Sequence, residues 1–256
     1  MINKISLVVL ILLLSLMPFI PVQAADEENE GIAQVILITP KAGHAQSLVD
    51  AITDYHHWIA SKAGHFEYQW YEILTGPDTG KYIARSGNHN WADFDAVHDW
   101  DEEAGQQFVT NVAPHIEGIV RTVTSNMDEF GNWPEDITGY THYQVEQWYV
   151  RNGQGGAFRR GLKKIVDTLK AGGFPNYWGF VSVESGGYGN QITLVSANKG
   201  WSDMTDKDPS FFDIMSKELG GEEEFSKFMS EWGETFKQGK TQMVRYMQEA
   251  SDYGNK

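Results

Sequence analysis

The chain contains no cysteine among its 256 residues. It therefore has no disulfide, no thiolate nucleophile and no thiolate metal site, and we expect no lipid-anchored lipoprotein, because such an anchor needs a cysteine after the N-terminal apolar run. Stability has to come from a packed core. An apolar content of 41% with 13% aromatic residues is sufficient to build one.

Positive charge is scarce, since 20 Lys and Arg residues face 35 Asp and Glu residues, for a formal net charge of −15. A field of this sign repels nucleic acid and anionic membrane surfaces, so neither is expected as a partner. The acidic balance is explained by solubility alone, and we infer no cationic partner from it.

The apolar run at the N-terminus is too short to span a bilayer. It follows Lys4, extends from Ile5 to about Ile20, and falls short of the roughly 20 residues that a transmembrane helix needs. Val22 and Ala24 fit a signal-peptidase site. We expect residues 1–24 to be a signal peptide and the mature protein to be periplasmic or secreted, with no membrane attachment after cleavage.

The common catalytic signatures are missing as well. The sequence has no Gly-x-Ser-x-Gly motif, no phosphate loop and no dinucleotide-binding glycine pattern after a strand. The helical metal spacings His-x-x-x-His and His-Glu-x-x-His are also absent. We therefore expect no tight metal site.

Internal repetition is the most informative feature that is present. The segment Ala33-Gln34-Val35 recurs as Tyr143-Gln144-Val145, and Trp91-Ala92-Asp93-Phe94 recurs as Trp201-Ser202-Asp203-Met204, both at a separation of 110 positions. The sequence therefore predicts two copies of one structural unit.

Each copy is predicted to have the same order of elements: strand, helix, hairpin of two strands, helix and strand. In the first copy the strands are expected at 34–39, 66–74, 81–86 and 119–121, with helices over 48–59 and after Asn90. In the second copy they are expected at 143–150, 177–184, 191–197 and 243–245, with helices over 158–169, 209–219 and 225–236. The closing strands match at a separation of 124 positions, which predicts an insertion of 14 residues in the last helical region.

A single βαββαβ unit leaves one apolar sheet face uncovered, and a second unit can cover it. The order of elements, the glycine-rich hairpins and the Trp-x-Asp start of the second helical region resemble the dimeric α+β barrel superfamily, which includes the antibiotic-biosynthesis-monooxygenase-like proteins. The resemblance implies an α+β fold of two tandem ferredoxin-like βαββαβ units, residues 25–131 and 132–256, packed sheet to sheet as an intramolecular dimeric α+β barrel. A monomer with an internal pseudo-dimer is then expected.

The resemblance also implies a ligand between the helices and the helix-facing side of the sheet. The superfamily includes cofactor-free oxygenases, haem-degrading enzymes and haem peroxidases. The haem-degrading pattern has an asparagine on the first strand and a histidine ten residues after a tryptophan. Here the strand Val35-Ile36-Leu37-Ile38 has no asparagine, and Thr110 lies ten residues after Trp100. The haem-degrading pattern therefore does not fit, and we predict no cofactor, while the sequence does not decide whether haem or a metal binds.

The candidate site residues come from the histidines, seven of which lie in the first copy. His56 falls on the apolar face of the first helix, and His98, one turn after Phe94, is expected on the second helix facing the same cleft. We name these two as catalytic candidates. The histidines also fit chance scatter, and His56 also fits a core histidine. The predicted ligand-binding residues are aromatic: Tyr68, Trp70 and Trp100.

Two functions remain open. The first is an exported protein that binds a small hydrophobic or aromatic ligand in the helix-sheet cleft, with a cofactor-independent monooxygenase-like activity as its enzymatic form. The second is a non-enzymatic exported scaffold for partner contacts. The sequence does not decide whether the protein is an enzyme.

Overall fold

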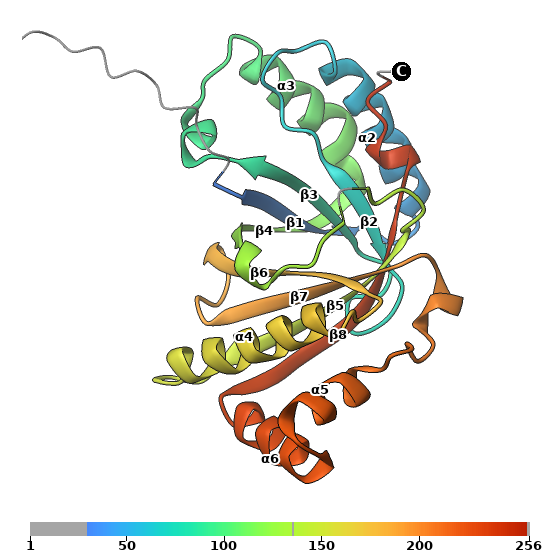
Figure 1. Ribbon diagram of the computed structural model, residues 1–256. Helices are drawn as coiled ribbons and strands as arrows, with labels where there is room; N and C mark the ends of the chain where they lie inside the picture. The colour runs from blue at the N-terminus through green and yellow to red at the C-terminus, as the bar shows by residue number, and fades with distance from the viewer. Residues whose placement is uncertain (1–29, 135, 255–256) are drawn as a thin grey trace, which may run out of the picture.

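A computed structural model describes residues 30–134 and 136–254, so the expected signal peptide lies outside the described residues. Eight strands form a closed antiparallel barrel, and the five α-helices of the described residues lie outside it. Figure 1 shows α2 and α3 on one side of the barrel and α4, α5 and α6 on the other. In the described residues, no helix has the length and apolar character needed to cross a membrane.

The strands and the long helices expected from the sequence are present. We call residues 25–131 the first half and residues 132–256 the second half. The elements of the first half are β1 (Ile32–Pro40), α2 (Ala45–Ile59), β2 (Gln69–Ile73), β3 (Tyr82–His89), α3 (Asp101–Gln107) and β4 (Ile116–Asn126). Those of the second half are β5 (His142–Val150), α4 (Gly155–Ala171), β6 (Tyr177–Ser185), β7 (Gln191–Asn198), α5 (Phe211–Leu219), α6 (Glu222–Gly233) and β8 (Phe236–Tyr246).

The barrel closes because the two halves pair at their strand edges. The first half contributes the order β4-β1-β3-β2, and the second half contributes β8-β5-β7-β6. One seam joins β2 to β8, with Tyr71 opposite Tyr246, and the other joins β4 to β6, with Asn126 opposite Val181. These seams leave no strand edge of the eight-stranded sheet unpaired, which removes the usual site of edge-to-edge aggregation.

The strand register repeats between the two halves. Gln34 lies opposite Ser86, and Gln144, 110 positions after Gln34, lies opposite Ser196. The closing strands keep a different separation from the predicted one. Val35 lies opposite Thr122 and Val145 lies opposite Gln242, so equivalent positions of β4 and β8 are 120 apart. The predicted separation of 124 was wrong because hydrogen-bond register, and not the similarity of three side chains, fixes which residues correspond.

The sheet has a core on each of its two faces. Inside the barrel, Ile73 packs with Tyr143, Ala197 and Val244, so both halves contribute to one apolar interior. On the outer face, α2 covers the cluster of the first half, which includes Ile38, Leu48 and Trp70. Alternation of side chains along each strand produces both cores at once.

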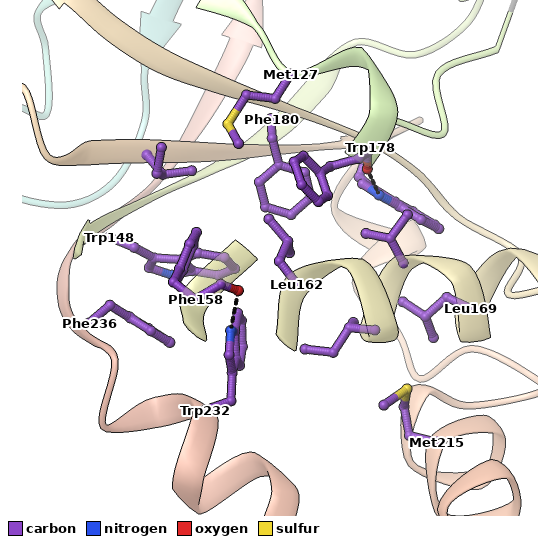
Figure 2. Packing of buried hydrophobic residues seen from close by; sticks show 14 of the residues in the cluster. Met127, Trp148, Phe158, Leu162, Leu169, Trp178, Phe180, Met215, Trp232 and Phe236 are labelled. Atoms are coloured by element: carbon purple, nitrogen blue, oxygen red, sulfur yellow. Dashed lines mark hydrogen bonds between the residues drawn. The ribbon is translucent and has the colours of Figure 1, made fainter. Parts of the chain in front are cut away.

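The helix-facing core of the second half is filled with aromatic side chains, as Figure 2 shows. Trp148 packs edge-on against Trp232, whose Nε1 donates to the carbonyl of Phe158 at 3.1 Å. Met127 and Phe130, which follow β4, belong to this same cluster, and Trp178 Nε1 donates to the Phe130 carbonyl at 2.9 Å. The end of the first half therefore helps to build the core of the second.

The second helical region of the first half differs from the prediction. A 3-10 turn spans Trp91–Asp95, and α3 begins only at Asp101. Asn90 caps the turn as expected, with its backbone N–H donating to Asp93 Oδ2 at 2.8 Å. The backbone N–H of His98 donates to Asp101 Oδ2 at 2.8 Å, which fixes the start of α3 after His98. A local side-chain hydrogen bond has replaced one continuous helix.

Gly161 tests the close packing of α4 against α6. A Cβ atom at this position would lie 2.2 Å from Trp232 Cδ1, and Trp232 is itself buried. We expect Gly161→Ala to lower the free energy of unfolding by about 1–3 kcal/mol, because the indole has to move within a filled core. Urea denaturation measures the change.

Gly105→Ala is the matched control, because Gly105 lies in α3 and an added Cβ would meet nothing within 4 Å. It should raise the free energy of unfolding by about 0.5–1 kcal/mol through the lower entropy of the unfolded chain. Equal stability of the Gly161→Ala variant and the unchanged protein would contradict the close contact.

Candidate functional site

His56 lies in the buried layer between α2 and the C-terminal segment. Its side chain is on the apolar face of α2, as predicted, and only 3% of the residue is exposed. The imidazole stacks on the ring of Tyr253, with centroids 4.2 Å apart and planes 12° apart. Burial lowers the pKa of His56 to about 4, although a hydrogen bond with the backbone of Ala250 opposes this shift. The ring is therefore neutral at neutral pH.

Tyr253 was missed by the sequence reasoning. It follows the last short turn of the chain, Glu249–Ser251, which packs against α2. Its hydroxyl accepts a hydrogen bond from the backbone N–H of Tyr68 at 2.6 Å, and burial raises its pKa above the ordinary value. No local pattern could have indicated this position, because its partners lie far away in the chain.

Two of the predicted ligand-binding residues, Trp70 and Tyr68, lie near His56. Trp70 is buried on β2 with its ring 6.3 Å from that of His56, and its backbone N–H donates to Ser251 Oγ at 2.8 Å. The Tyr68 hydroxyl donates to the side-chain oxygen of Gln34, and burial raises the pKa of Tyr68 to about 12. The structure thus brings His56, Trp70 and Tyr68 together.

Three buried side-chain nitrogens in this region have no hydrogen-bond partner among the described residues: His56 Nδ1, His65 Nε2 and Trp70 Nε1. The rings of both His56 and His65 lie next to Tyr253, at 4.2 Å and 5.5 Å between centroids. His65 Nε2 is 3.8 Å from the carboxylate of Glu67, which is beyond hydrogen-bond distance. Each unsatisfied buried nitrogen costs about 1–3 kcal/mol, so their concentration in one place favours a functional role.

His98 does not lie on a helix facing His56, contrary to the sequence prediction. It lies in the turn before α3, stacked on Trp100 with centroids 4.5 Å and planes 14° apart. Trp70 and Trp100, both predicted to bind the ligand, do not lie side by side, because Trp70 is in the core under α2 while Trp100 packs against the cluster of Ile59, Ala104 and Tyr253. The break in the second helical region explains both corrections.

His98 and Trp100 line an open depression of about 580 Å³. Its other walls come from the segment after α2 and from Glu103 of α3, and Trp100 Nε1 donates to the Ala63 carbonyl at 3.2 Å. Lys62 Nζ and Glu103 Oε2 form an ion pair across it at 3.0 Å. Because Trp100 packs against the Tyr253 cluster, this depression lies on the outer side of that cluster.

The part of the chain that the structure describes contains no cluster of three or more histidine, aspartate and glutamate side chains that could hold a metal ion. His44 and His115 form a close pair, with their Nδ1 atoms 3.0 Å apart. Two nitrogens at this distance share one hydrogen bond, in which one ring donates and the other accepts.

Comparison with known proteins identifies the fold. No protein-family profile and no curated protein matches the chain. A proposed monooxygenase from Lactobacillus acidophilus NCFM is 11% identical with a TM-score of 0.50, over 85% of this chain and 94% of its own. A proposed monooxygenase from Fusobacterium nucleatum subsp. nucleatum is 12% identical with a TM-score of 0.52. The match covers 84% of this chain and 92% of that protein. Chlorite dismutase from Candidatus Nitrospira defluvii is 8% identical with a TM-score of 0.53. The match covers 88% of this chain and 96% of that protein. At such low identities the likeness shows the fold alone.

The lowered pKa of His56 predicts an acid-sensitive fold. The unfolded chain binds a proton below the ordinary histidine pKa of 6.5, whereas the folded chain binds it only near its own pKa of about 4. The free energy of unfolding that this group contributes is therefore fully present above pH 6.5. It falls as the pH drops towards 4, by about 3 kcal/mol in total. His56→Phe should remove that part of the loss, as measured by urea denaturation along a pH series.

The matched control for this experiment is His57→Gln, at the exposed neighbouring position on α2. It should leave most of that loss of stability in place, because burial, and not the charge of His57, is the main cause of the lowered His56 pKa. If His56→Phe and the unchanged protein lose the same stability between about pH 6.5 and about pH 4, the buried neutral histidine is refuted.

Proposed function

We propose that the chain is a tandem member of the dimeric α+β barrel superfamily, related to the antibiotic-biosynthesis-monooxygenase-like proteins. The two ferredoxin-like units would be residues 25–131 and 132–256, joined as an intramolecular dimer. The repeated register supports this assignment, because Tyr71 and Tyr246 at one seam correspond to Val181 and Asn126 at the other. The similar structures also align along most of their own length.

The tandem assignment predicts that the first half cannot stand alone. Residues 25–131 would expose the free edges of β2 and β4 and an inner sheet face that carries Leu37, Tyr71 and Ile83. We expect this fragment to self-associate or aggregate in size-exclusion chromatography with light scattering, while the whole chain remains a monomer. A stable monomeric fragment that binds no hydrophobic dye would contradict the assignment.

We propose further that the protein is exported and binds a small hydrophobic, aromatic ligand on the helix side of the first half. The observation that carries this proposal is the group of three unpartnered buried nitrogens, those of His56 and His65 beside Tyr253 and that of Trp70 next to His56. The depression beside His98 and Trp100 is the entrance, and its stacked rings give a flat ligand an aromatic surface. The ligand would extend from there towards the buried group of His56, Trp70 and Tyr68, which do not themselves line the depression.

The pKa of His56 supports binding more strongly than catalysis. A histidine with a pKa of about 4 is a weak base, so it accepts a hydrogen bond from a ligand hydroxyl more readily than it removes the proton. A cofactor-independent monooxygenase-like activity would need that proton removed before dioxygen reacts with the ligand. We place this activity second to ligand binding.

Calorimetric titration with 2-naphthol, a small aromatic alcohol, tests the proposal. We expect His98→Ala and Trp100→Ala each to weaken binding by about tenfold, since both rings contact the ligand at the entrance. The matched control is Trp201→Ala, an exposed tryptophan of the second half that should leave the affinity unchanged.

An oxygen electrode in the same titration measures whether bound 2-naphthol is oxidised. If the protein binds 2-naphthol without taking up oxygen, ligand binding without oxidation is its activity. Absence of binding by 2-naphthol and by larger aromatic alcohols would refute the ligand site and favour the non-enzymatic scaffold.

A further inference from the structure

A second cavity, of about 560 Å³, lies in the second half, between the outer face of the sheet and the start of α5. Its floor is formed by three polar side chains on neighbouring strands, Gln144 of β5 with Ser196 and Asn198 of β7. Phe211 and Phe212, the first residues of α5, form part of the opposite wall. The volume lies within the range of about 300–1,000 Å³ typical of small-molecule sites.

The floor keeps acceptor groups available. Asn198 is only 3% exposed, and its Nδ2 donates to the backbone carbonyl of Ser196 at 3.3 Å. Gln144 Nε2 donates to Glu146 Oε1 at 2.8 Å. No group in the described residues donates a hydrogen bond to the amide oxygen of either side chain. Both oxygens can therefore accept from a ligand.

The corresponding place in the first half is closed by its own side chains. Gln34 and Ser86 occupy the same register as Gln144 and Ser196. There the Tyr68 hydroxyl donates to Gln34, and His89 Nε2 lies 2.8 Å from Ser86 Oγ with its ring stacked on Phe66 at 3.9 Å. The equivalent polar positions are therefore filled by side chains in the first half and left open in the second.

The side chains that fill the first-half place have changed or turned away in the second half. Trp178 stands 110 positions after Tyr68, but its Nε1 donates to the Phe130 carbonyl within the helix-facing core of the second half. Lys199 stands 110 positions after His89, and its Nζ lies over the ring of Tyr140. In the second half no side chain of the described residues covers this polar floor, so a ligand can occupy the space above it.

The charges around the cavity favour a neutral ligand. Lys207 Nζ is held by the Asp203 carboxylate at 2.9 Å and by the Asp203 carbonyl at 2.6 Å, so this cation is already neutralised. Asp206 is a further lining carboxylate, and the chain as a whole carries −15. An anionic ligand would be repelled.

The polar floor and the aromatic wall together indicate a ligand with hydroxyl groups on one side and carbon-bound hydrogens on the other. An unsubstituted aromatic ring would bury the amides of Gln144 and Asn198 without partners, at about 1–3 kcal/mol for each group. A sugar ring offers hydroxyl groups to the amides and its apolar face to Phe212, which is 41% exposed. We propose that this cavity binds a neutral pyranose sugar, a site that is independent of the aromatic-ligand site of the first half.

Saturation-transfer NMR with the purified chain tests the sugar site. The probes are the methyl glycosides of glucose, galactose, mannose and N-acetylglucosamine, each at millimolar concentration. We expect transfer to at least one of them, strongest at the hydrogens of the apolar ring face. Phe212→Ala should weaken its binding by about tenfold, and Asn198→Ala should weaken it at least as much.

Two further variants keep the test decisive if Asn198→Ala destabilises the fold. Thr205→Trp, at an exposed lining position, should abolish transfer by filling the cavity. Tyr188→Ala, a 69% exposed aromatic residue outside both cavities, is the control and should leave transfer unchanged.

Transfer to none of the four glycosides, or transfer that persists in both Phe212→Ala and Thr205→Trp, would overturn the sugar site. Binding of 2-naphthol that is lost in Phe212→Ala would also overturn it, by making this cavity an aromatic site. Loss of 2-naphthol binding only in His98→Ala and Trp100→Ala bears on the first-half site alone, so the two proposals fail separately.

Discussion

Pairing of edge strands between the two halves is the constraint on which the remaining structure depends. Each four-stranded sheet has two free edges, and the seams β2 with β8 and β4 with β6 join all four. Once closed, the barrel has an apolar interior shared by both halves and an outer face that must be covered by helices. The second-half cavity lies on that outer face, whereas the depression beside His98 lies among the residues around the ends of α2 and α3.

The two halves cover the outer face by different means. In the second half, Trp148, Phe158, Trp232 and Phe236 fill the space under the helices, and an additional helix, α5, extends the layer. In the first half, the layer contains neutral His56, and the C-terminal turn completes it with Tyr253. The two halves of the sheet therefore support an aromatic core on one side and a polar aromatic cluster on the other. The barrel needs only its sheet in order to close, so the layers that cover the two halves can differ.

The local elements could be predicted because they follow from periodicity. Alternation in strands and the apolar stripe of α2 place His56 on the buried face from the sequence alone. The position of His98 could not be predicted in this way, since a hydrogen bond from its backbone to Asp101 competes with helix formation. The equivalence of β4 and β8 failed for a related reason, because three similar side chains carry less information than a ladder of hydrogen bonds.

By itself, the sequence determined the order of the strands and long helices, the dependence on a packed core and the residues on the buried face of α2. These properties depend on neighbours within one or two turns of the chain. Only the tertiary structure decided how the sheets join, that His56 stacks on Tyr253, and that the Gln144 floor stays open while the Gln34 floor is filled. The physical reason is distance along the chain: the contact of Tyr68 with Tyr253 joins residues 185 positions apart, and no local pattern encodes it.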